Sequence, residues 1–180
     1  MSDVTGKLTP EQALEIVERL CEKGGEIREA VVAEAMNVLA EFTLDEIADE
    51  VFDVLDSIDV QDCWDQAGGS STAHTTPNEA AIDFVEEELQ PFFDQVERYH
   101  ELGMPEQEAA YCKGVLLGIY RFEHEAESDV KRLAEEIPAE CAGNLLEEWQ
   151  ERNPEKTGID AMYAFIRERC PEWADWLKEE

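Results

Sequence analysis

Residues 111–120 read YCKGVLLGIY, so apolar or small side chains occupy nearly every face of a helix. Because a helix that is apolar all round is buried inside a fold, we expect the helix that begins at Pro105 to be the most buried element. Gly114 and Gly118 lie four residues apart and face the same way. In a membrane this spacing is typical of a dimerising helix, whereas in a soluble chain it predicts close packing against a neighbouring helix.

Signals of helix starts and ends recur on both sides of this stretch. Three threonines, Thr9, Thr43 and Thr76, each precede a Gln or Glu by three residues, which is the spacing of a capping box. Pro91 lies inside one expected helix and predicts a kink or break near Gln90. Helices are expected at about 10–23, 27–41, 44–58, 60–67 (capped by Asp59), 77–102, from 105 onward, and at 128–137, 139–151, 158–170 and 171–178.

No segment alternates polar and apolar residues as a strand does, so we predict an all-α fold of about eight or nine helices. Residues 112–120 and 141–149 share the pattern Cys-x-Gly-x-Leu-Leu-x-x-aromatic at an offset of 29 residues. Such a repeat favours a solenoid-like array of helical hairpins, and an irregular helical bundle is the alternative.

We expect one domain over residues 1–180, with a flexible loop near 68–76 where the sequence is rich in Gly, Ser and Thr.

The chain is strongly acidic, with 14 Lys and Arg against 45 Asp and Glu and a formal net charge of −31. No basic patch is set apart from the acids, so direct binding to nucleic acid or to an anionic membrane is not expected. A basic protein is the partner that this charge favours, and solubility alone is the alternative explanation.

Three features indicate a cytoplasmic protein. The first residues show no signal-peptide pattern. The longest apolar run, residues 115–120, is too short to cross a bilayer. The five cysteines form no C-x-x-C pair, which fits a reducing compartment.

Glu97 and His100 form one Glu-x-x-His pair, the ligand spacing of helical di-metal centres. A second pair is missing, because Arg121 stands three residues before His124. A metal-dependent helical enzyme centred on Glu97 and His100 is therefore an alternative hypothesis. The other interpretation is an exposed pair on a charged helix end, and we expect no cofactor.

Aspartates recur at every third position from Asp53 to Asp65. A calcium site would need acids and carbonyls presented by one loop with a glycine at its turn, and no such EF-hand order is present. On a helix this spacing spreads the carboxylates around the surface, although two or three of Asp59, Asp62 and Asp65 could gather where one helix is expected to end. We interpret these three as a solvated acidic edge and as candidate contacts for a partner.

Trp173 and Trp176 lie three residues apart on the last expected helix and form an apolar face. Tryptophan contributes strongly to binding when it fills a pocket of a partner. The same pair can instead close the end of the helical core, so both roles are considered.

Four segments carry a resemblance to a known family: LDEIA at 44–48, IDVQDCWDQAG at 58–68, TPNEAA at 76–81 and GVLLGIYR at 114–121. Residues 44 to about 150 resemble a helical region of uncharacterised prokaryotic proteins that is often attached to a SWIM-type zinc finger. The resemblance implies an all-helical module that stands alone or is joined to another domain. The C-x-C and C-x-H ligands of the zinc finger are absent, so zinc and nucleic-acid binding are not implied.

No Ser or Cys stands in a recognisable turn with an oriented base, so we expect a non-enzymatic protein. The leading hypothesis is a scaffold or interaction module that binds a basic protein. An alternative is a nucleic-acid mimic, in which rows of carboxylates occupy a DNA-binding protein. The sequence does not define an oligomeric state.

Overall fold

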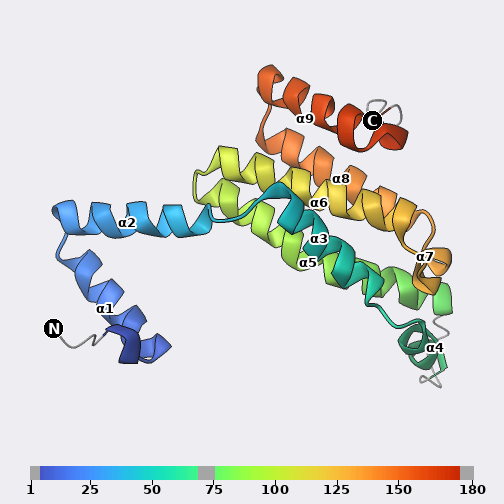
Figure 1. Cartoon of the computed structure of the whole chain (residues 1–180), viewed down its shortest axis with the longest axis horizontal. Helices are drawn as coiled ribbons and strands as arrows, with labels where there is room; N and C mark the ends of the chain where they lie inside the picture. Colours follow the sequence, from blue (N-terminus) through green and yellow to red (C-terminus); the bar gives the residue numbers. More distant parts are fainter. Residues whose placement is uncertain (1–4, 69–75, 175–180) are drawn as a thin grey trace. The chain divides into compact units, whose positions relative to one another are not determined.

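The computed structural model describes residues 5–68 and 76–174. These residues form nine α-helices and two 3₁₀ helices with no strand, which confirms the all-α prediction (Figure 1). In chain order the elements are η1 (Thr5–Lys7), α1 (Pro10–Glu22), α2 (Gly25–Leu39), α3 (Leu44–Asp56), α4 (Val60–Gly68), α5 (Pro77–Glu101), α6 (Pro105–Glu125), α7 (Asp129–Leu133), α8 (Ile137–Arg152), α9 (Lys156–Arg169) and η2 (Pro171–Trp173).

The chain divides into two compact units, and one domain over residues 1–180 stays a prediction. Unit 1 is Met1–Phe42 and contains α1 and α2, and unit 2 is Thr43–Glu180 and contains the remaining helices. The division has a physical cause, because the buried hydrophobic side chains of the described chain begin at Ile47 and all belong to unit 2.

Helix α6 is the centre of unit 2, as the sequence predicts. Ten of its residues are buried, from Glu108 to Phe122. It contacts α3, α5, α8 and α9, and in Figure 1 α8 (orange) lies beside it. Helices distant in sequence therefore pack on one central helix, which is the arrangement of an irregular bundle. The two matching segments of the sequence fall on α6 and α8.

The glycines of α6 explain how closely α3 approaches it. A Cβ atom at Gly114 would lie 2.7 Å from Ile47 Cβ, and one at Gly118 would lie 2.6 Å from Val51 Cβ. Real Cβ atoms do not approach so closely, so α3 can occupy this position only because both residues lack a side chain. The predicted close packing inside the fold is confirmed.

The predicted capping boxes are present at the starts of α1, α3 and α5. At α5, for example, Thr76 N donates to Glu79 Oε2 over 2.6 Å, and Glu79 N donates to Thr76 Oγ1 over 3.2 Å. Each box satisfies two backbone N–H groups that the helix itself leaves without acceptors.

Of the kink or break expected near Gln90, the break is wrong, because α5 runs without interruption from Pro77 to Glu101, and the kink stays a prediction. Pro91 lies on the exposed side of the helix. Its missing N–H therefore leaves the carbonyl of Glu87 on the side that faces water, where solvent replaces the lost hydrogen bond.

One predicted helix is shorter in the structure, and two other predicted segments lie partly outside the described residues. The helix expected at 128–137 is only the short α7, Asp129–Leu133. The helix expected at 171–178 begins as η2, and its residues after Ala174 lie outside the described residues. The flexible loop predicted near 68–76 also lies outside them, except for Gly68 at the end of α4 and Thr76 at the cap of α5.

Candidate functional site

The strongest candidate for an interaction surface is the N-terminal hairpin, which consists of α1 and α2. No described side chain of either helix is buried. Nine large hydrophobic side chains of the described chain are exposed, and seven of these belong to the hairpin: Leu14, Ile16, Val17, Ile27, Val32, Met36 and Val38. Concentrated apolar exposure of this kind marks a surface that binds another molecule.

The local sequence explains why the two helices form a hairpin. Thr9 and Gln12 make the capping box at the start of α1. Between the helices, Gly24 has φ +67° and Gly25 has φ +56°. Both values lie in the left-handed region, which glycine adopts without steric cost, so the chain reverses direction over a short turn.

Helix α2 carries two apolar rows, and both contain exposed members. The first row contains Ile27, Val31, Ala35 and Val38, and the second contains Val32, Met36 and Leu39. Ile27 and Val38 are exposed in the first row, and Val32 and Met36 are exposed in the second. Within unit 1, α1 packs on α2 and leaves part of each row in water.

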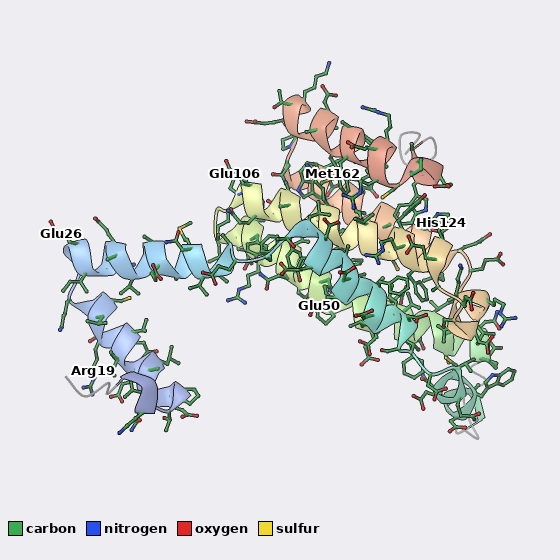
Figure 2. The ribbon with its side chains drawn as sticks, viewed as in Figure 1. Arg19, Glu26, Glu50, Glu106, His124 and Met162 are labelled. Carbon is green, nitrogen blue, oxygen red and sulfur yellow. The ribbon has the colours of Figure 1, made fainter. Side chains whose placement is uncertain are left out.

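The charges of the hairpin are unevenly distributed along its length. All three basic residues, Arg19, Lys23 and Arg28, lie near the turn, and Figure 2 labels Arg19 on α1 together with Glu26 at the start of α2. The opposite, open end is acidic and contains no basic residue from 10 to 17 or from 31 to 41.

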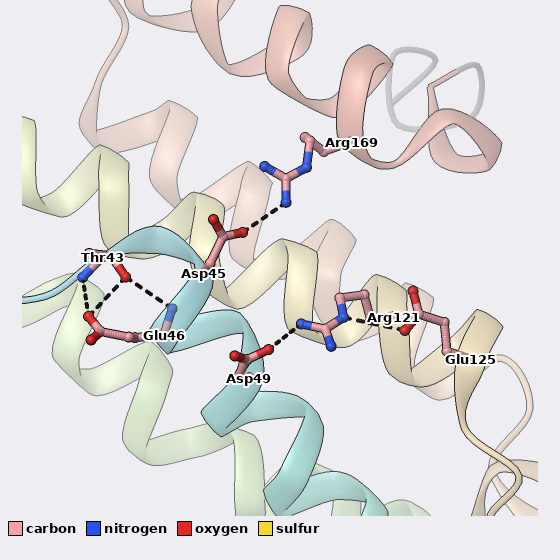
Figure 3. A network of polar contacts seen from close by, with 7 residues as sticks. All are labelled: Thr43, Asp45, Glu46, Asp49, Arg121, Glu125 and Arg169. Atoms are coloured by element: carbon pink, nitrogen blue, oxygen red, sulfur yellow. Dashed lines mark hydrogen bonds and ion pairs between the residues drawn. The ribbon is translucent and has the colours of Figure 1, made fainter.

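The surface of unit 2 is acidic, and several of its arginines are held in ion pairs within the unit. Arg121 NH1 lies 2.5 Å from Asp49 Oδ1, and Arg169 NH2 lies 2.8 Å from Asp45 Oδ1 (Figure 3). Figure 3 also shows Glu125 on the other side of Arg121. These pairs tie α6 and α9 to α3 and reduce the positive charge available to an anionic ligand.

The three candidate aspartates lie on or next to α4 and are exposed. Asp59 Oδ1 accepts from Gln61 N over 2.8 Å, so Asp59 caps α4 as predicted. Asp65 Oδ1 accepts from Gln61 Nε2 over 2.9 Å. These contacts fit an acidic helix edge in water, and the role of all three aspartates in binding a partner stays a prediction.

Trp173 is buried beside α6. Its Nε1 donates to Glu123 Oε2 over 2.8 Å, and its ring meets Tyr120 edge-on with 5.2 Å between the centroids. Since only 1% of Trp173 is exposed, its position favours the core-closing interpretation over a contact with a partner. Trp176 lies outside the described residues.

His100, near the end of α5, lies beside Glu108 of α6, a residue that the Glu97–His100 sequence pattern does not include. The distance from His100 Nδ1 to Glu108 Oε2 is 3.3 Å. Glu97 is exposed on α5. Among the described residues, no three His, Cys, Asp or Glu side chains form a cluster that can hold a metal ion.

Glu108 is the centre of a buried polar cluster that sequence reasoning missed. It is fully buried, unlike every other charged side chain in the described part of the chain. Asn153 Nδ2 donates to its Oε1 over 2.9 Å, and Arg152 Nε lies 3.5 Å from the same oxygen. The cluster joins the ends of α5 and α8 to the start of α6. The signal was present in the sequence, because position 108 lies in line with the apolar positions 111, 112 and 115 of the same helix and with Met104 at its N-cap.

The buried thiols are poorly suited to nucleophilic chemistry. Burial, followed by the carboxylate of Glu108, raises the pKa of Cys112. Burial also raises the pKa of Cys141 to about 11 and that of Cys170 to about 12. Because the thiolate is the reactive form, these side chains act as small core residues.

A groove of about 580 Å³ lies between the start of α6, the end of α8 and the start of α9. Its wall includes Trp149, Arg152 and Asn153. Arg152 already pairs with Glu108 and lies 3.7 Å from Glu148, so its charge is used within the fold. The groove therefore presents no cluster of reactive or metal-binding groups.

Comparisons of the chain with protein-family models, with curated proteins and with solved structures find no match. In the described part of the chain, no helix has the length and apolar character that crossing a membrane requires. The resemblance to the helical region associated with SWIM-type zinc fingers stays a prediction.

Proposed function

We propose that this chain is a non-enzymatic protein–protein interaction module. In this proposal the N-terminal hairpin is the surface that docks onto protein, and unit 2 is a packed acidic body. The exposure of seven large hydrophobic side chains on α1 and α2 carries the proposal. Each such side chain contributes roughly 1 kcal/mol or more when it leaves water, so an uncovered hairpin has a strong tendency to associate.

The charge of unit 2 favours a basic protein as the binding partner of its surface. Residues 43–180 contain 10 basic and 36 acidic residues, a net charge of −26, whereas residues 1–42 contain 4 basic and 9 acidic residues, a net charge of −5. Electrostatic attraction to unit 2 is sensitive to salt, whereas apolar docking on the hairpin persists at high salt. The two surfaces can therefore be separated by ionic strength.

A metal-dependent enzyme is not proposed. His100, the candidate ligand, lies beside Glu108, and the other oxygen of that carboxylate is held by Asn153 and Arg152. These partners give Glu108 the environment of a structural carboxylate that joins helix ends.

The proposal is tested by affinity capture from native lysate with three baits at low and high salt. The baits are the natural chain, the hairpin variant Leu14→Glu and the matched control Leu102→Glu, since both leucines are exposed but only Leu14 belongs to the hairpin. We expect a protein that resists high salt to be retained by the natural chain and the control and lost from Leu14→Glu. Equal retention by all three baits at high salt would contradict the proposal, as would a natural chain that is monomeric and retains no protein.

A further inference from the structure

We infer that the hairpin's apolar surface is covered by a second copy of this chain, through antiparallel pairing of two hairpins into a four-helix bundle. The inference rests on the proposed function, since it names the protein that docks on the hairpin. It also adds a consequence, because a dimer would present two acidic copies of unit 2 to a partner.

The first argument comes from the two apolar rows of α2. A helix with one apolar stripe is satisfied by one neighbour, whereas α2 has exposed hydrophobic residues in both rows and contacts α1 within its unit. In a four-helix bundle each helix packs against two neighbours around a shared core. Two hairpins related by a two-fold axis supply that second neighbour to all four helices.

The second argument is that unit 2 offers no matching apolar patch in its described residues. Its exposed large hydrophobic side chains are Trp64, on α4, and Leu102, which follows α5. Two separate side chains do not match a surface made by seven. A second hairpin carries the same seven side chains, so its surface is matched in size and chemistry.

Charge sets the direction of pairing. The turn end of the hairpin carries Arg19, Lys23 and Arg28 among four glutamates, and Arg19 pairs with Glu15 of the same helix. The open end carries Glu11, Glu34 and Glu41, with Lys7 of η1 just before α1. Antiparallel pairing places Lys23 and Arg28 of one copy beside the acidic open end of the other. Parallel pairing would place two acidic ends together.

The test is sedimentation equilibrium of the purified full-length chain over a concentration series. We expect the natural chain to approach twice its 20.4 kDa mass as concentration rises.

Val32→Glu introduces a charge into the second row of α2 at an exposed position and raises helix propensity. This variant should stay monomeric with unchanged helical circular dichroism, and the control Leu102→Glu should dimerise like the natural chain. A monomeric natural chain, a dimeric Val32→Glu or an equal loss in Leu102→Glu would each overturn the inference.

A second set of variants tests the pairing without changing the apolar surface. Charge reversal at the turn end should weaken dimerisation at least tenfold, and the same charge change in unit 2 should weaken it less. Charge reversal at the open end, combined in one chain with the turn-end substitutions, should restore dimerisation if the pairing is antiparallel. Failure to restore it would overturn that arrangement. The turn set is Arg19→Glu, Lys23→Glu and Arg28→Glu, the control set is Arg98→Glu, Lys156→Glu and Arg167→Glu, and the restoring set is Glu11→Lys, Glu34→Lys and Glu41→Lys.

This experiment fails separately from the capture experiment. A chain that sediments as a monomer but still retains a protein through the hairpin overturns the second copy and supports the proposed function. A dimer that depends on the hairpin supports the inference, whatever else unit 2 binds.

Discussion

Glu108 holds three helix ends together from inside unit 2. Its carboxylate accepts from Asn153, lies beside Arg152 and faces His100. Removing the buried carboxylate leaves Arg152 without this counter-charge and Asn153 without its acceptor, and breaking a buried ion pair typically costs about 3–5 kcal/mol. We therefore predict that Glu108→Ala lowers the free energy of unfolding by about this amount in urea denaturation.

One further variant separates the charge of Glu108 from its shape, and a second variant is a control at an exposed position. Glu108→Gln keeps an oxygen that can accept from Asn153 and should lose less stability than Glu108→Ala. Glu106→Ala, at an exposed position two residues earlier, should change stability by less than about 0.5 kcal/mol. Equal losses for Glu106→Ala and Glu108→Ala would contradict a special role for the buried cluster.

Trp173 closes the core at the far end of the chain. Its ring packs on Tyr120, and its N–H is satisfied by Glu123. Truncation of a buried tryptophan costs about 3–5 kcal/mol, so Trp173→Ala should lower the melting temperature markedly. Trp173→Phe retains part of the packing but leaves Glu123 without this donor, and its loss should be smaller. A melting temperature unchanged by Trp173→Ala would instead favour a role in binding.

At the scale of helices, the contact of α3 with α6 depends on two glycines. A Cβ at Gly118 would lie 2.7 Å from the carbonyl oxygen of Ala48, a backbone atom that cannot rotate away. Gly118→Ala should therefore force the helices apart and destabilise the protein by about 1–3 kcal/mol, as measured by chemical denaturation.

Gly158→Ala in α9 is the matched control for this substitution. A Cβ there would meet Trp149 Cη2 at 3.8 Å, an ordinary contact distance. Since alanine favours a helix interior by about 1 kcal/mol over glycine, Gly158→Ala should be neutral or stabilising. If both variants lost stability equally, close packing of α3 on α6 would not be the cause.

At the scale of the whole of unit 2, the buried thiols should make the free energy of unfolding fall at alkaline pH. Burial raises the pKa values of Cys112, Cys141 and Cys170 above the ordinary value of 9.0. Below pH 9 the thiols are protonated in both states, whereas above it only the unfolded chain ionises them. Stability should therefore be lost as pH rises, by roughly 1 kcal/mol per thiol at pH 10.

The urea midpoint measured from pH 7 to pH 10 checks this dependence. Cys141→Ala should reduce the slope of stability against pH, because it removes one of the groups that ionises on unfolding. A midpoint that rises between pH 8 and pH 10 would contradict the expected sign.

The sequence predicts features that depend on neighbours in the chain better than features that depend on distant contacts. The threonine caps and the two glycines of α6 were predictable because a short pattern defines each of them. Glu108 was missed because its partners come from α5 and α8, and Pro91 was expected to break a helix that packing and solvent allow to continue. The second apolar row of α2 was not predicted, and only the structure shows that α1 leaves both rows partly exposed.

The central claim is that the hairpin's apolar surface binds protein. The most direct measurement is the amount of protein that natural chain, Leu14→Glu and Leu102→Glu retain from lysate at high salt. We predict that only Leu14→Glu loses the retained protein while its melting temperature stays that of the natural chain. Retention by Leu14→Glu equal to that of the natural chain would contradict the claim.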